Sequence, residues 1–123
     1  MAALNKALIV DDEESIRYFL SELLSGFGFD CEEAASADQA LTALEADDFG
    51  LMLLDVRMPG MSGLELLRLV REQGNPIRVV VLSALGDPEV AAEAVTSLGA
   101  NAFIGKPCSV DELQQTVERI LRD

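Results

Sequence analysis

Short apolar runs alternate along the chain with longer amphipathic stretches. Four runs have the length and composition of strands buried on both faces: Ala7–Val10, Leu51–Leu54, Val79–Leu82 and Ala102–Ile104. The more polar Phe29–Ala34 predicts a weaker strand near the sheet edge. Because strands that alternate with helices form a parallel sheet covered on both faces, the pattern predicts one α/β domain over residues 1–123.

The helices are predicted from apolar spacing and from capping residues. The first carries apolar residues from Ile16 to Leu24 and stops at Gly26. Another is expected from Asp87, with a proline in its first turn, to the residue before Gly99. Three serines mark further helix starts, because each precedes Gln or Glu by three positions as in a capping box: Ser36, Ser62 and Ser109.

Composition excludes several functions. The 22 acidic and 9 basic residues give a net charge of −13, which repels nucleic-acid phosphates and anionic lipid, so neither is an expected partner. No apolar run approaches the roughly 20 residues of a membrane span, and the first ends at Asp11, too early for a signal peptide. Two cysteines make no disulfide framework. We therefore expect a cytoplasmic protein.

Polar residues stand at the carboxyl ends of the predicted strands, where open α/β sheets bind their ligands. Each of them alone would be read most simply as a helix cap or a solvated loop residue. Together they predict a site at one edge of the sheet: Asp11, Asp12, Asp55, Ser83 and Lys106.

Three converging carboxylates require a counter-ion. Two of them about 4 Å apart repel by roughly 4 kcal/mol at an effective dielectric constant near 20. Oxygen ligands select a hard cation, and Mg²⁺ uses few carboxylates and leaves coordination positions for a phosphate. A metal, a lysine and a hydroxyl together indicate phosphoryl transfer. Asp55 is the best nucleophile candidate, because it follows the most apolar strand and precedes the turn Arg57–Gly60.

Four motifs closely resemble the receiver domain of two-component response regulators: Val10-Asp11-Asp12-Glu13, the segment from Leu54 to Gly63, Leu82-Ser83-Ala84, and Gly105-Lys106-Pro107. The resemblance covers essentially the whole chain. It implies a flavodoxin-like fold, with five parallel strands in the order 2-1-3-4-5 and five helices on two faces. It also implies a phosphorelay switch that turns over no free substrate and receives its phosphoryl group from the phosphohistidine of a sensor histidine kinase or phosphotransfer protein.

The resemblance assigns the acidic residues to phosphorylation and to Mg²⁺. Asp55 is expected to be the phosphoacceptor. The expected Mg²⁺ ligands are Asp12, Asp55 and the backbone carbonyl of Arg57, with Asp11 acting through a metal-bound water.

The remaining motif residues are expected to convert phosphorylation into a change of surface. Lys106 would pair with the phosphoryl oxygens, and the Ser83 hydroxyl and the Ala84 N–H would donate to them. Phe103 matches the switch aromatic, which would relay the change to the surface of the helix from Asp87, the strand Ala102–Ile104 and the last helix. The resemblance also allows a homodimer through this surface.

Two other functions remain open at this point. An aspartyl-phosphate phosphatase has a similar site, but it generally needs a second acid two positions after the nucleophile, where this chain has Arg57. A flavin or nucleotide carrier needs a phosphate-binding loop after a strand. The only G-x-G here, Gly26-Phe27-Gly28, follows a helix.

Overall fold

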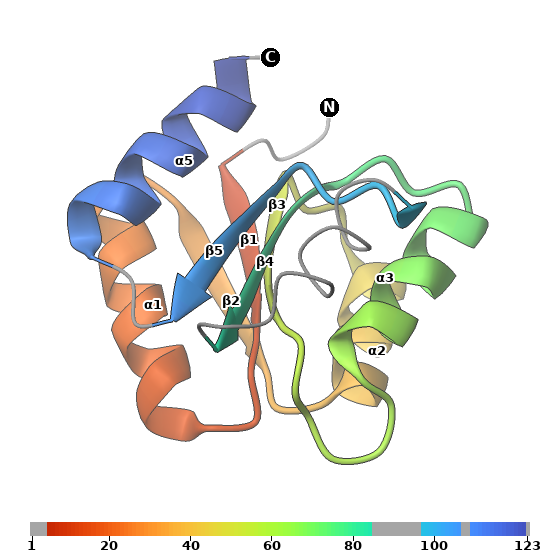
Figure 1. Ribbon diagram of the computed structural model, residues 1–123. Helices are drawn as coiled ribbons and strands as arrows, with labels where there is room; N and C mark the ends of the chain where they lie inside the picture. Colours follow the sequence, from red (N-terminus) through yellow and green to blue (C-terminus); the bar gives the residue numbers. More distant parts are fainter. Residues whose placement is uncertain (1–4, 85–96, 107–108, 123) are drawn as a thin grey trace.

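The computed structural model describes residues 5–84, 97–106 and 109–122, with the side chains of residues 84 and 106 left out. Its strands form one parallel sheet in the order β2-β1-β3-β4-β5 (Figure 1). The predicted strand positions and the order implied by the resemblance are confirmed. The strands are β1 (Lys6–Val10), β2 (Asp30–Ala34), β3 (Leu51–Asp55), β4 (Arg78–Ala84) and β5 (Ala102–Lys106).

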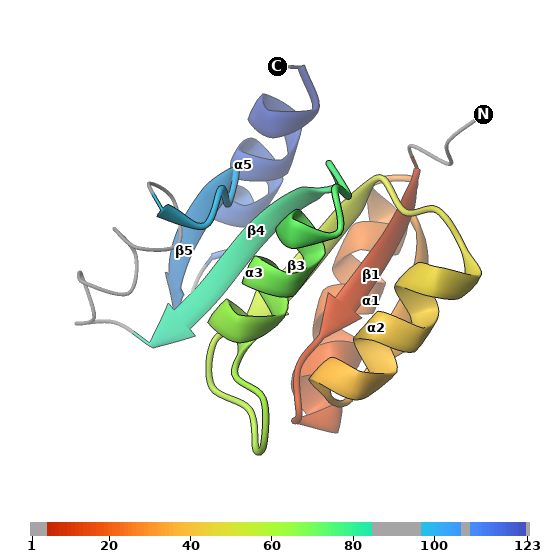
Figure 2. The ribbon, with the colours of Figure 1, turned by 90° about the vertical axis from the view of Figure 1, so that its right-hand side faces the viewer.

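Four helices lie within the described residues: α1 (Glu14–Gly26), α2 (Ala37–Ala46), α3 (Gly63–Glu72) and α5 (Val110–Arg122). Helices α1 and α5 cover one face of the sheet, and α2 and α3 lie side by side on the other (Figures 1 and 2). The structure thus bears out the α/β layers and four of the five predicted helices. The helix predicted from Asp87 lies in residues 85–96, outside the described part of the chain. None of the described helices carries an apolar stretch of membrane-spanning length.

The predicted capping serines are confirmed. The hydroxyl of Ser36 accepts a hydrogen bond from the backbone N–H of Gln39 at 3.2 Å, and Ser109 accepts one from Glu112 at 3.0 Å. Ser62 accepts from Glu65 in the same way, at 3.3 Å. Each bond satisfies a backbone donor that the first turn of a helix leaves without an intrahelical partner.

The apolar core has two halves, one on each side of the sheet. Alternate strand residues such as Val10 and Leu54 face α2 and α3, whereas their neighbours Ile9 and Leu53 face α1 and α5. All four are at most 1% exposed. The central strands are therefore stabilised by burial on both faces. The mostly exposed β2 lies at the sheet edge, as predicted.

Arg71 ties α3 to the loops that precede β4 and β5. Its guanidinium donates to the carbonyl of Ile77 at 2.7 Å and to the carbonyl of Gly99 at 2.8 Å. Asn101 extends this link, because its side chain accepts from the backbone N–H of Val79 at 2.9 Å. Burial lowers the pKa of Arg71 from its ordinary value. The amino-terminal edge of β4 and β5 is thus organised by one cation that is held mainly by neutral carbonyls.

Candidate functional site

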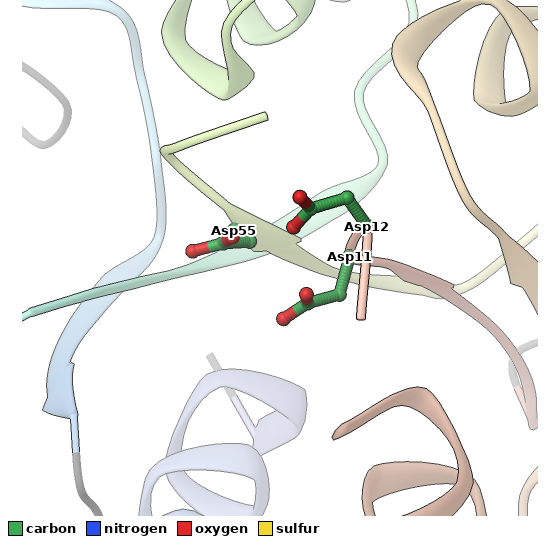
Figure 3. A group of neighbouring side chains, drawn as sticks. All are labelled: Asp11, Asp12 and Asp55. Carbon is green, nitrogen blue, oxygen red and sulfur yellow. The ribbon is translucent and has the colours of Figure 1, made fainter. Parts of the chain in front are cut away.

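Three carboxylates meet at the carboxyl edge of the sheet. Asp11 and Asp12 follow β1, and Asp55 ends the adjacent strand β3. One carboxylate oxygen from each lies within 4.8 Å of an oxygen from each of the others (Figure 3). Asp11 is 1% exposed and Asp55 is 7% exposed, whereas Asp12 lies open to solvent. The predicted convergence of these acids is confirmed.

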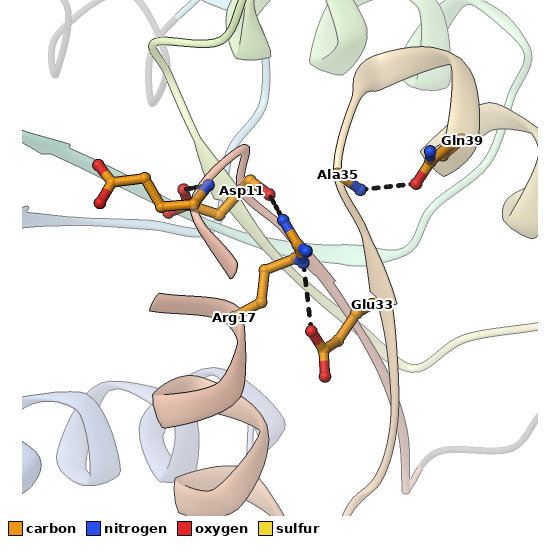
Figure 4. Close-up of polar contacts among 6 residues, drawn as sticks. Asp11, Arg17, Glu33, Ala35 and Gln39 are labelled. Carbon is orange, nitrogen blue, oxygen red and sulfur yellow. Dashed lines mark hydrogen bonds and ion pairs between the residues drawn. The ribbon is translucent and has the colours of Figure 1, made fainter. Parts of the chain in front are cut away.

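The turn between β1 and α1 holds Asp11 at both its backbone and its side chain. Its N–H continues the sheet ladder to the carbonyl of Ala34 at 3.1 Å. Its Oδ1 accepts from the backbone N–H of Glu13 at 2.9 Å (Figure 4). A carboxylate that bonds the backbone two residues ahead stabilises a local turn. The side chain of Asp11 is therefore oriented by the start of α1.

The connection from β3 to α3 holds the backbone of Asp55. The N–H of Val56 donates to the carbonyl of Leu82 at 3.1 Å, and the N–H of Gly63 returns to the carbonyl of Val56 at 2.9 Å. A Cβ atom on Gly63 would lie 2.1 Å from the carbonyl oxygen of Asp55, far inside van der Waals contact. Only glycine allows the first turn of α3 to pack this closely behind Asp55.

An open pocket of about 490 Å³ adjoins the acids. Its lining joins Asp12 to the loop after β3: Asp12, Val56, Arg57, Met58, Pro59 and Ser62. Arg57, expected to supply a backbone carbonyl, therefore lines the same pocket as Asp12. The pocket leaves room beside Asp12 for solvent or for a phosphoryl group.

Ser83 brings a buried hydroxyl to the same edge. It lies near the end of β4, one position past Leu82, which is in register with Asp55. The residue is 1% exposed, and its Oγ has no hydrogen-bond partner among the described residues. A buried hydroxyl is stabilised when it donates to an acceptor. A phosphoryl oxygen at this edge would be such an acceptor.

The other predicted site residues are placed mainly by the backbone. Ala84 and Lys106 are in register at the ends of β4 and β5, on the edge that carries the three acids. The side chain of Lys106 lies outside the described atoms. Phe103, paired with Val81, is partly buried and packs on the core half beneath α2 and α3.

The donor set fits Mg²⁺. All three side chains offer carboxylate oxygens, the ligands of hard cations. Oxygens bound to one Mg²⁺ lie at most about 4.2 Å apart, twice the usual metal–oxygen distance. A cluster of oxygens within 4.8 Å of one another is therefore close to the size of a Mg²⁺ coordination shell.

Sequence reasoning missed one residue of this region. Arg17 lies in the first turn of α1, and its Nη1 donates to the backbone carbonyl of Asp11 at 2.8 Å. A cation in the first turn opposes the helix dipole. This unfavourable position was the one sign in the sequence that Arg17 has a partner outside the helix.

Comparison with known proteins agrees with this geometry. Residues 7–118 match the family described as the response regulator receiver domain. The chain is 35% identical over 116 residues to sporulation initiation phosphotransferase F of Bacillus subtilis. The matched region covers 94% of this chain and 93% of that protein. It is 36% identical to the DNA-binding transcriptional regulator NtrC of Klebsiella pneumoniae, covering 94% of this chain but only 24% of that longer protein.

Solved structures show the same fold. The receiver domain of NtrX from Brucella abortus superimposes with a TM-score of 0.88 at 36% identity, covering 94% of this chain and 98% of that one. The response regulator TrrA from Thermotoga maritima, solved in complex with Mg²⁺ and BeF, gives a TM-score of 0.84 at 28% identity, with 94% and 98% covered. These likenesses give no support to the phosphatase alternative. The chain belongs to the response regulator receiver family, whose domains are phosphorylation-dependent switches of two-component signalling.

Proposed function

We propose that Asp55 is the phosphoacceptor of this receiver domain and takes its phosphoryl group from a phosphohistidine of a kinase or phosphotransfer protein. The observation that carries the proposal is the meeting of Asp11, Asp12 and Asp55 at the carboxyl edge of β1 and β3. Asp55 is the natural acceptor of the three, because it ends the fully buried strand β3 and its backbone is held from behind by α3. We take residues 1–123 as one such domain, acting in the cytoplasm.

The same acids would hold Mg²⁺. Asp12, Asp55 and the backbone carbonyl of Arg57 are the proposed direct ligands, and Asp11 is proposed to act through a bound water. When bound, Mg²⁺ offsets part of the negative charge of the three carboxylates and of the phosphoryl oxygens, which carry roughly −1.5 to −2 charges. Support comes from the oxygen-only donor set and from the relative TrrA, which was solved with Mg²⁺ and BeF.

The residues of the chain then have separate tasks. A carboxylate oxygen of Asp55 attacks phosphorus, and the bond from phosphorus to the donor imidazole breaks. The departing ring nitrogen keeps the electron pair of that bond and takes up a proton. Lys106 pairs with the charge of the phosphoryl oxygens, and the hydroxyl of Ser83 and the N–H of Ala84 donate to them. Each transfer modifies Asp55 of the protein itself, so no free substrate is turned over.

Ser83 and Phe103 are the proposed switch. The Ser83 hydroxyl gains an acceptor on phosphorylation, and this favours a β4 end drawn toward Asp55. Phe103 lies on the adjacent strand and is only partly buried, so a change in its packing would alter the exposed surface. The change would reach the surface formed by the helix predicted from Asp87, β5 and α5, where an effector or a second copy would bind.

The test uses acetyl phosphate as the donor and gel mobility or intact mass as the readout. We expect the wild-type protein to become phosphorylated only when Mg²⁺ is present. Asp55→Asn should abolish the product, whereas Asp48→Asn, the same change at an exposed acid after α2, should leave it intact. Persistence of the phosphorylated product in Asp55→Asn would refute the assignment.

A further inference from the structure

Arg17 connects the helix that follows the acidic site to the two strands beneath it. Its Nη1 donates to the backbone carbonyl of Asp11 at 2.8 Å, and its Nε donates to Oε1 of Glu33 on β2 at 3.2 Å. Figure 4 shows the guanidinium between these two acceptors. The Arg17 side chain is only 14% exposed, whereas the side chain of Glu33, at the edge of the sheet, is 39% exposed.

The position of this arginine is unfavourable for the helix itself. The first turn of a helix carries partial positive charge, and a cation there costs about 0.3–1 kcal/mol where an acid would stabilise. The contacts of Arg17 outside α1 compensate for this cost. They reach the point at which the chain leaves β1 for the metal-binding edge.

We propose that Arg17 is a positioning residue for the metal site, acting through the peptide that joins Asp11 to Asp12. Because a peptide unit is planar, a bond to the carbonyl of Asp11 also restrains the nitrogen and Cα of Asp12. Glu33 keeps the guanidinium in place, so the direction in which Asp12 leaves the sheet is set jointly by β2 and α1. The inference rests on the proposed function, in which Asp12 is a direct Mg²⁺ ligand.

Arginine suits this task better than lysine. Its planar fork donates to two acceptors in fixed directions, whereas an ammonium is a flexible point charge. Groups that orient metal ligands without touching the metal typically contribute 10- to 100-fold to metal affinity. Loss of Arg17 is therefore expected to weaken Mg²⁺ binding while the attacking oxygen of Asp55 remains intact.

The test compares Arg17→Gln, Arg17→Lys and Glu33→Gln with the control Arg119→Gln. Arg119 is an exposed arginine in the last turn of α5, at the opposite end of the sheet, and its substitution removes the same charge (Figure 1). Mg²⁺ affinity is measured by calorimetry. The Mg²⁺ concentration for half-maximal labelling by acetyl phosphate is measured separately from the maximal rate.

We expect Arg17→Gln to raise the Mg²⁺ dissociation constant at least 10-fold, with the maximal labelling rate changed less than threefold. Arg17→Lys should fall between Arg17→Gln and wild type, Glu33→Gln should weaken binding two- to fivefold, and Arg119→Gln should have no effect. If Arg17→Gln does not fold, as judged by thermal unfolding in EDTA, the other two variants decide the matter.

Three results would overturn the inference. One is wild-type Mg²⁺ affinity in Arg17→Gln, or in both Arg17→Lys and Glu33→Gln. Another is an equal loss in Arg119→Gln, which would reduce the effect to net charge. The third is a wild-type protein that takes up no Mg²⁺, and this result alone would also overturn the proposed function.

Discussion

Gly63→Ala tests whether tertiary packing or helix propensity decides the effect of this residue on stability. Gly63 is the first residue of α3, and its φ is not positive. Propensity alone therefore predicts that alanine stabilises the protein by about 0.4–1 kcal/mol, because it restricts the unfolded chain. The structure predicts the opposite sign.

The added methyl group would meet only backbone. Its carbon would lie 2.1 Å from the carbonyl oxygen of Asp55, 2.9 Å from its carbonyl carbon and 3.0 Å from the Cα of Val56. None of these atoms can rotate away, so α3 and the end of β3 must separate by about 1 Å to restore contact, and overpacking of this kind typically costs 1–3 kcal/mol. Less the gain from restricting the unfolded chain, we expect a net loss of about 1 kcal/mol in the free energy of unfolding.

Urea unfolding followed by circular dichroism measures this change. The control is Gly26→Ala at the end of α1, where an added Cβ meets nothing within 4 Å and φ is not positive, so about 0.4–1 kcal/mol of stabilisation is expected. Displacement of Asp55 by about 1 Å should also slow its Mg²⁺-dependent labelling by up to about 100-fold. A Gly63→Ala protein as stable as wild type, with normal labelling, would refute the packing argument.

Three further predictions follow from individual contacts. Asp12→Asn removes one of three mutually repelling carboxylates, so it should raise the thermal midpoint of unfolding in EDTA. It should also abolish the further rise of the midpoint that Mg²⁺ produces in the wild type, and an unchanged response to Mg²⁺ would contradict the role of Asp12 as a ligand. Arg71→Ala leaves several carbonyls without their donor and should lower the free energy of unfolding by about 2–3 kcal/mol in urea, whereas Arg68→Ala on the exposed face of α3 should change it by less than about 0.5 kcal/mol. Burial raises the pKa of the Cys31 thiol, so iodoacetamide at pH 8 should alkylate Cys31 more slowly in the folded protein than in urea, as followed by mass spectrometry of the Cys31 peptide. Because the folded state holds the thiol proton more tightly, the protonated thiol contributes to stability below its ordinary pKa, and this contribution is lost as the pH rises through the raised pKa of the folded state. Equal alkylation rates in the folded and unfolded states would contradict the direction of the pKa shift.

The positions of the strands and of several helix starts depend on neighbouring residues, so they could be predicted from the sequence alone. Apolar periodicity located the five strands, and the i to i+3 spacing from Ser36, Ser62 and Ser109 located three helix starts. The meeting of Asp55 with the acids after β1 was also predictable. Parallel strands end at one edge of the sheet, and a polar residue after each strand must emerge there.

Only the tertiary structure decided the contacts between segments distant in the chain. The strand order 2-1-3-4-5 came from a family resemblance and not from spacing, because parallel strands of similar composition pair equally well in several orders. Three contacts could not be predicted, because the neighbouring sequence does not indicate which residue each one reaches. They are the close approach of Gly63 to Asp55, the bonds from Arg71 to backbone carbonyls, and the bridge from Arg17 to Glu33. Each depends on which backbone atoms the sheet and its covering helices bring within a few ångströms of one another, and that proximity exists only once the layers have packed.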